Sequence, residues 1–179
     1  MAQREILLAD NPVLRQKAKK IRIIDAGVQR LIDDMVETMD LAHGVGLAAP
    51  QVGESVRVLV IRIPESEPMA LINPQVVKRS GERILEEGCL SIPGWRGEVK
   101  RSVTVLVKAL NQHGREIRIK ATDDLLAQAL EHEIDHLDGV LYIDRLTAPD
   151  RMWKLLPPEE EGEGSEDGLV GAGSHSVEI

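Results

Sequence analysis

The 179-residue sequence has one cysteine, no phenylalanine, one tyrosine and no long hydrophobic run. The single cysteine, Cys89, excludes an intrachain disulfide and is typical of a reducing compartment. No apolar stretch approaches the roughly 18 residues that a membrane span needs, and the N-terminus has no signal-like apolar block. The scarcity of aromatic rings argues against base stacking as a function. These absences predict a cytoplasmic protein with no membrane partner.

A surplus of basic residues is also missing. The net charge is -8, and seven acidic residues lie after Leu156, where there is no Lys or Arg. Removing these seven from the 30 acidic residues leaves 23 against 22 basic ones, so the rest of the chain is nearly neutral. We therefore expect no DNA-binding face. The length fits one domain, which we place at residues 1–156, followed by an acidic tail at 157–179 whose Gly, Glu and Ser content predicts disorder.

Hydrophobic periodicity predicts two helices and several strands. Apolar residues recur at helical spacing from Asp25, a plausible N-cap, to Ala42. The β-branched runs at 56–63 and 102–110 favour strands, and the second run forms a predicted hairpin with 115–120. A second helix begins near Thr122 or Asp123 and ends before Gly139. The predicted fold class is α+β.

The second helix contains EHEIDH, in which His132 and His136 are four residues apart and Glu133 lies between them. Two histidines at this spacing can share one metal ion, and the glutamate can reach a metal-bound water. At about 100° per residue, all three lie on the apolar side of the helix. A solvated helix with incidental histidines is the alternative, but a buried glutamate is costly without a compensating partner. The opposite arc is expected to face water and carries Asp124, Glu131, Asp135 and Asp138.

A catalytic metal needs a third ligand. The pattern HxxGxxH would supply a third histidine at position 142, where this chain has Tyr142. Only the acidic tail offers a later glutamate, so the search moves upstream to Cys89 in EEGCLSIPG. A buried core role is the commonest alternative for a free cysteine. A Cys/His/His set would leave one metal position open for water, as catalytic sites do.

Three stretches in order, GVGLAAPQ (44–51), EGCLS (87–91) and HEIDH (132–136), resemble the signature motifs of the peptide deformylases. The resemblance includes DNPVLR, GWRGEV and IDRL and covers roughly residues 4–146. It implies antiparallel sheets around the C-terminal HExxH helix. It also implies a metal-dependent hydrolase that removes the formyl group from the N-terminal formylmethionine of new proteins and releases formate.

The resemblance assigns a role to each matching residue. Cys89, His132 and His136 match the metal ligands, and Glu133 matches the catalytic acid/base. Gln51 and the Leu90 N–H match the donors to the oxyanion. The implied metal is Fe(II), with Zn, Ni or Co as substitutes. The substrate-binding positions, around the methionine pocket and the peptide backbone, are His43, Gly44, Val45, Gly46, Leu85, Arg96, Leu125, Gln128 and Ala129.

The implied partners are nascent N-formylmethionyl peptides, with a transient ribosome contact that the acidic tail would oppose by repelling RNA. Glu131 and Asp124 depart from the family pattern, which commonly has Gln and Gly there. Two other hypotheses stay open. A zincin-type peptidase would need a third ligand other than Cys89, and a metal-stabilised binding module would not depend on Glu133.

Overall fold

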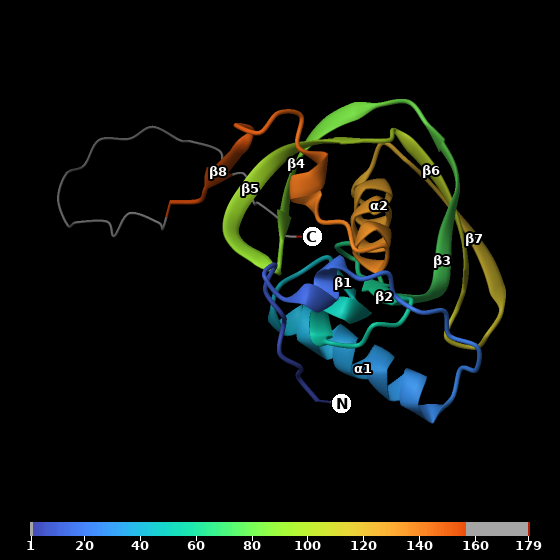
Figure 1. The fold of residues 1–179 in the computed structure, drawn as a ribbon. Helices are drawn as coiled ribbons and strands as arrows, with labels where there is room; N and C mark the ends of the chain where they lie inside the picture. Colours follow the sequence, from blue (N-terminus) through green and yellow to red (C-terminus); the bar gives the residue numbers. More distant parts are fainter. Residues whose placement is uncertain (1, 157–178) are drawn as a thin grey trace, which may run out of the picture.

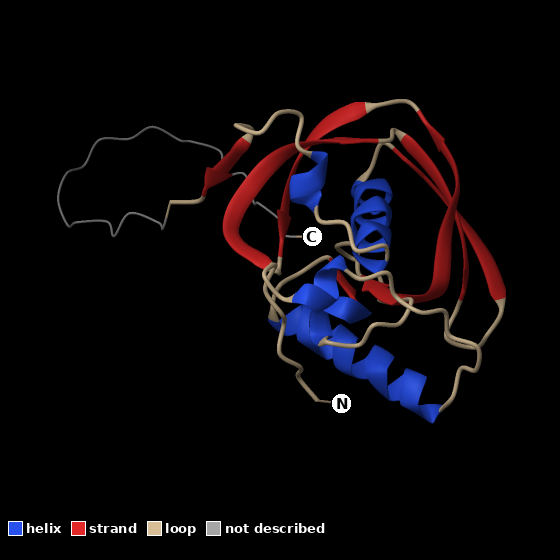
Figure 2. Ribbon diagram, viewed as in Figure 1, coloured by secondary structure: helices blue, strands red, loops and turns tan. Residues whose placement is uncertain are grey.

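Two antiparallel sheets surround one helix in a computed structural model of the chain, which describes residues 2–156 and 179 (Figures 1 and 2). The larger sheet has the order β1-β2-β3-β6-β7, and the smaller has the order β4-β5-β8. Helix α2 lies between them, and α1 packs on β1 and β2. The predicted α+β class, with antiparallel sheets around the HExxH helix, is confirmed.

The larger sheet contains the two β-branched runs found in the sequence. The predicted strands at 56–63 and 102–110 correspond to β2 and β6, and the predicted hairpin with 115–120 is formed by β6 and β7. The strand bounds are β1 Gly46–Ala48, β2 Val58–Ile61, β3 Met69–Ser80, β4 Arg83–Cys89, β5 Ile92–Arg101, β6 Thr104–Leu110, β7 Glu116–Thr122 and β8 Met152–Lys154.

Helix α1, Ala26–Leu41, begins where its N-cap was predicted. The Asp25 side chain accepts a hydrogen bond from the Val28 N–H at 3.0 Å, which satisfies one of the free donors at the helix start. Its apolar face packs against the larger sheet and buries Val28, Leu31, Ile32, Met35 and Met39. This packing supports the short strand β1, which leads into the candidate site.

Helix α2, Leu125–Leu137, begins slightly later than predicted. Its N-cap is Asp124, whose side chain accepts a hydrogen bond from the Ala127 N–H at 2.8 Å, whereas Asp123 has a positive φ of 51°. Every side chain from Ala127 to Leu137 is buried. The helix ends before Gly139, as predicted. This glycine has φ +74°, and a Cβ there would lie 2.6 Å from the backbone oxygen of Arg15.

The predicted tail lies outside the described residues, except for its last residue. Ile179 is 3% exposed and belongs to the apolar cluster between α2 and the larger sheet. Three 3₁₀ helices, Pro12–Arg15, Ala49–Val52 and Tyr142–Arg145, complete the described elements. Within residues 2–156, neither α-helix is long and apolar enough to cross a membrane.

Candidate metal centre

The three predicted ligands come together between the two sheets. Helix α2 carries His132 and His136, and Cys89 is the last residue of β4. One potential ligand atom from each lies within 4.8 Å of the others, and no side chain of the three is more than 2% exposed. The sulfur of Cys89 lies 3.3 Å from Nε2 of His136. The helix and the end of one strand therefore form a compact set of one thiol and two imidazoles.

The distances and the unsatisfied atoms fit a metal ion. In a tetrahedral site with typical metal–sulfur and metal–nitrogen bonds, sulfur and nitrogen are about 3.6 Å apart, close to the separation of Cys89 and His136. Nε2 of His132 is buried and has no hydrogen-bond partner among the described residues. Such an atom is costly unless something binds it. A metal ion at the centre of the three side chains would bind it.

Glu133 lies next to these ligands and is completely buried. Neither carboxylate oxygen has a hydrogen-bond partner in the described part of the chain. Burial raises the pKa of Glu133 to about 7, and the nearby negative charge of Glu87 adds to this effect, while His132 and Arg101 oppose it. A carboxyl group with this pKa can accept and return a proton near neutral pH.

Gly46 in β1 leaves the space that Glu133 occupies. A Cβ at position 46 would lie 2.8 Å from both Cγ and Cδ of Glu133 and would also collide with Oε1. Real Cβ atoms essentially never show such contacts. Position 46 in the first motif therefore has no room for a side chain. The backbone of β1 and the Glu133 side chain of α2 can approach this closely only without a side chain at Gly46.

Glu87 holds His132 in one orientation. Nδ1 of His132 donates a hydrogen bond of 2.6 Å to Oε1 of Glu87, which leaves Nε2 available to bind a metal ion. Burial lowers the pKa of His132, but its contacts with Cys89 and Glu87 outweigh burial and raise that pKa well above its ordinary value. For His136, burial and the charge of His132 lower the pKa well below its ordinary value.

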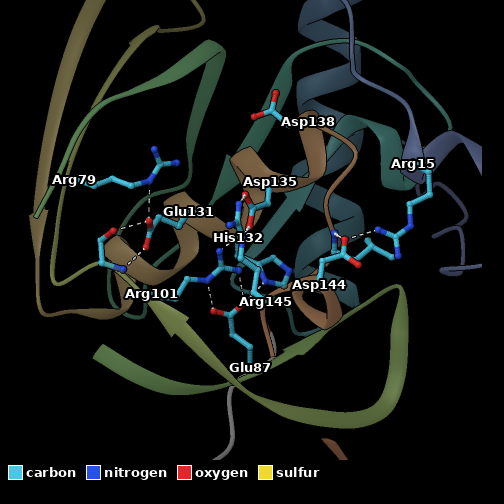
Figure 3. A network of polar contacts seen from close by, with 12 residues as sticks. Arg15, Arg79, Glu87, Arg101, Glu131, His132, Asp135, Asp138, Asp144 and Arg145 are labelled. Atoms are coloured by element: carbon cyan, nitrogen blue, oxygen red, sulfur yellow. Dashed lines mark hydrogen bonds and ion pairs between the residues drawn. The ribbon is translucent and has the colours of Figure 1, made fainter. Parts of the chain in front are cut away.

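Glu87 belongs to a buried network of charges behind the metal ligands (Figure 3). Arg101 donates two hydrogen bonds of 2.7 Å to Glu87 and a third of 2.7 Å to Asp135. Arg145 binds the same Asp135 at 2.8 and 3.0 Å. Burial raises the pKa of Glu87, but the hydrogen bonds from Arg101 and His132 outweigh it and lower that pKa to about 2. The network therefore keeps Glu87 ionised against His132.

The prediction that one arc of α2 faces water is wrong for two of its four residues. Glu131 is 6% exposed and Asp135 is 5% exposed, whereas Asp124 and Asp138 are exposed. Glu131 accepts hydrogen bonds from the N–H and hydroxyl of Ser102, at 2.8 and 2.9 Å, and from Arg79 at 3.1 Å. The helical wheel assumes that only the apolar side of α2 is buried. In the structure, the smaller sheet and the β5–β6 connection cover the opposite side as well.

The two predicted oxyanion donors lie beside Cys89. The side-chain oxygen of Gln51 accepts a hydrogen bond from the Ala48 N–H at 2.8 Å. This contact turns the amide nitrogen of Gln51 toward Cys89 Sγ, 3.7 Å away, and Ser91 Oγ, 3.1 Å away. Leu90 follows Cys89 at the end of β4. Both predicted donors are therefore close to Cys89, one of the three candidate metal ligands.

The predicted substrate-binding residues divide into three groups. Val45, Ala129 and Leu125 belong to or pack on one apolar cluster with α2. Gly44 and Gly46 lie against Leu90 and Glu133. The third group consists of the remaining four residues. Gln128 is buried and donates a hydrogen bond to the Glu86 carbonyl at 3.0 Å, Leu85 is half-buried, His43 is exposed, and Arg96 is 7% exposed.

The sequence reasoning missed the charged network behind the ligands. Glu87 is two residues before Cys89, so strand alternation predicts that both side chains lie on one face, although the register of β4 shifts between the two residues in the structure. Metal-binding histidines usually donate their other N–H to a carboxylate or carbonyl. These two rules together could have identified Glu87. Nothing local in the sequence links Arg101 to Asp135, because they meet only when β5 packs on α2.

Comparisons with known proteins agree with this arrangement. The family model for polypeptide deformylase matches residues 3–152. A peptide deformylase of Dehalococcoides mccartyi is 53% identical over 161 residues, which cover 89% of this chain and 96% of that protein. A peptide deformylase of Thermomicrobium roseum is 48% identical over 174 residues and covers 93% of this chain and 97% of its own length.

Solved structures show the same fold. The crystal structure of a peptide deformylase from Legionella pneumophila has a TM-score of 0.80 at 45% identity and covers 84% of this chain and 89% of that one. A peptide deformylase from Synechococcus elongatus in complex with actinonin has a TM-score of 0.77 at 41% identity and covers 80% of this chain and 79% of that one.

Proposed function

The chain belongs to the peptide deformylase family of metal-dependent enzymes, which remove the N-formyl group from nascent peptides, and we propose that Cys89, His132 and His136 hold its metal ion. The observation that carries this proposal is the convergence of the three ligands beside Glu133, a buried carboxyl group without a partner among the described residues. The resident metal is proposed to be Fe(II), because one thiolate and two imidazoles suit a borderline-soft divalent ion. Zn, Ni or Co can occupy the same set.

Bound to these ligands, the metal would act as a Lewis acid and would make water nucleophilic near neutral pH. Glu133 accepts the proton of the water that attacks the formyl carbon. The same carboxyl group then returns a proton to the departing amine as formate leaves. Its pKa of about 7 suits both steps, because the group can be deprotonated for the first and protonated for the second.

Gln51 and Leu90 act on the negative charge that develops on the formyl oxygen. The amide nitrogen of Gln51 is held in place by the contact of its side-chain oxygen with the Ala48 N–H, so it needs no reorientation during the reaction. The backbone N–H of Leu90 is the second proposed donor. Removal of one such donor typically costs about 100- to 1000-fold in rate.

The methionine side chain is proposed to lie against Val45, Leu125 and Ala129, which belong to or pack on one apolar cluster beside the ligands. The other residues proposed to bind the substrate are Leu85, Gln128, His43, Gly44 and Gly46. Arg96 is proposed to bind the peptide backbone. Its guanidinium carbon lies 3.6 Å from the position that a Cβ would take at Gly88. Gly88 is the residue immediately before the proposed metal ligand Cys89 in the sequence.

Formate release from formyl-Met-Ala-Ser tests the assignment of roles. The iron-loaded protein should release formate, and Glu133→Ala should retain the metal but lose activity by at least about 100-fold. Cys89→Ala should lose metal and activity together. Full metal content in Cys89→Ala would favour a zincin-type peptidase, and unchanged function in Glu133→Ala would favour a binding module. No formate from the iron-loaded protein would contradict the proposal.

We also propose a cytoplasmic location and a transient contact with the ribosome, where formylated chains emerge. The single cysteine is buried and is proposed as a metal ligand, which suits a reducing compartment. Co-sedimentation with ribosomes that carry nascent chains tests the contact. Binding that persists on ribosomes without nascent chains would indicate a docking surface, and binding that depends on a formylated chain would indicate the active site alone.

A further inference from the structure

Ile179 is buried, although it lies beyond the part of the chain that matches the family model. The match ends at residue 152, whereas Ile179 is 3% exposed and belongs to the apolar cluster of α2 and the larger sheet. Leu156, at the end of the continuous described segment, is 89% exposed. The chain is therefore exposed at Leu156 and buried again at Ile179, and the residues around Ile179 indicate what this contact does.

The contact lies on the side of α2 that carries the candidate metal ligands. Figure 1 shows the end of the chain on the side of α2 where β4 ends at Cys89, away from β6 and β7. On the surface of α2, Leu125 and Ala129 lie at helical spacing from the two candidate histidine ligands and so share their face. Ala129 belongs to the cluster that buries Ile179, and Leu125 packs against it. Ile179 therefore lies at the rim of this cluster that is nearest to the ligands.

We infer that Ile179 occupies the proposed methionine pocket and competes there with the substrate. This inference rests on the proposed function, in which Val45, Leu125 and Ala129 contact the methionine side chain. All three belong to or pack on the cluster that buries Ile179. Isoleucine and methionine both have apolar side chains, with the same number of heavy atoms. Ile179 therefore offers the pocket a side chain of the size and chemistry that the pocket is proposed to bind.

The competition should be partial, because Ile179 and the pocket belong to one chain and gain only the burial of one side chain. Burial of an isoleucine side chain favours the occupied pocket by about 10- to 100-fold, and the loss of conformational entropy opposes this gain. A pocket that is open for only a fraction of the time binds its ligand more weakly by that fraction. We expect the contact to raise KM about 3- to 10-fold. Saturating substrate displaces Ile179, so kcat should not depend on it.

The kinetic experiment compares Ile179→Ser with Leu156→Ser in the metal-loaded full-length protein, with formyl-Met-Ala-Ser as substrate. Ile179→Ser should lower KM about 3- to 10-fold and leave kcat unchanged. Leu156→Ser removes an exposed apolar side chain and should change neither constant. A residue that only fills the core would lower stability on substitution without improving substrate affinity. A KM for Ile179→Ser that equals or exceeds the wild-type value would therefore overturn the inference.

Methyl NMR of the zinc-loaded protein tests the position of Ile179 without an activity assay. Ile179→Ser should shift the methyl signals of the three pocket residues and leave those of Val107 and Ala121, which belong to the same cluster on β6 and β7, unchanged. A synthetic peptide with the sequence of residues 171–179, added to this variant, should restore the wild-type signals.

Shifts confined to Val107 and Ala121, or a peptide that does not bind, would contradict the contact. If the wild-type protein releases no formate from any formylated peptide, the proposed function fails. The methyl signals would still report whether Ile179 lies against Val45, Leu125 and Ala129, so the two failures can be told apart.

Discussion

Glu87→Gln is the substitution that most directly tests how the charged network supports the metal ligands. The carboxylate of Glu87 accepts one hydrogen bond from His132, two from Arg101 and a longer one from Gln128. Glutamine keeps the size of the side chain but has only one oxygen. Its amide group must therefore turn N–H donors toward Arg101 or toward His132, both of which are donors themselves. The charge that balances Arg101 is also lost.

Two arguments give the same magnitude for the loss of stability. Removal of one partner from a buried ion pair typically costs about 3–5 kcal/mol. The lowering of the Glu87 pKa from 4.5 to about 2 corresponds to about 3 kcal/mol. A lowered carboxyl pKa stabilises the fold fully above pH 4.5 and loses that contribution as the pH falls through about 2. The difference between the wild-type protein and Glu87→Gln should therefore be largest near neutral pH and shrink below pH 4.5.

The metal site should weaken together with the fold, because Glu87 also sets the orientation of His132. Loss of such an outer partner typically costs about 10- to 100-fold in metal affinity. Urea unfolding at several pH values measures the first effect, and titration with a competing chelator measures the second. The control is Glu86→Gln, since the neighbouring Glu86 side chain is exposed and Gln128 contacts only its backbone carbonyl. A loss below about 1 kcal/mol at pH 7, with unchanged metal affinity, would refute the reasoning.

Two further substitutions test the space and the charges around α2. Gly46→Ala should displace the Glu133 carboxylate and lower kcat by about 100-fold while bound metal is retained. The control is Gly88→Ala, where the added Cβ has only ordinary contacts. Equal kcat values for the two variants would contradict the spatial argument. Glu131→Gln should cost about 1–3 kcal/mol in urea unfolding and leave kcat nearly unchanged, because every partner of the carboxylate, Arg79 included, presents a donor. A stable but inactive Glu131→Gln would show that Glu131 takes part in catalysis.

The parts of the site that lie within one helix could be predicted from the sequence. His132, Glu133 and His136 follow helical spacing, so their shared face follows from local geometry alone. Cys89 was reached by a different route, through the absence of a histidine at position 142 and the resemblance of the motifs. The three atoms meet only because β4 and α2 are brought together by the fold. Their proximity was therefore an expectation until the structure placed them within 4.8 Å of one another.

The strands on either side of the site were harder to find. β3 is 12 residues long, but it contains Asn73 and Pro74 and has two register shifts against β6. The alternation of buried and exposed residues along β3 is therefore interrupted. β4 and β5 alternate polar and apolar residues irregularly, because Glu87 and Arg101 point inward to the charged network. Patterns that assume an apolar core do not identify strands whose inner faces carry paired charges.

Hydrogen-bond partners, not burial, distinguish the proposed catalytic carboxyl group of α2 from the other buried acidic residues of the helix. Glu131, Glu133 and Asp135 are all buried, and the acidic pattern of EHEID does not distinguish them. Asp135 is balanced by two arginines, and Glu131 by Ser102 together with an arginine. Only Glu133, among these three, has both oxygens without a partner in the described chain. Burial without compensation raises its pKa to about 7, whereas Glu87, buried against Arg101, has a pKa of about 2. The distribution of arginines around the helix therefore leaves one carboxyl group able to exchange a proton, and that group lies beside the proposed metal ligands.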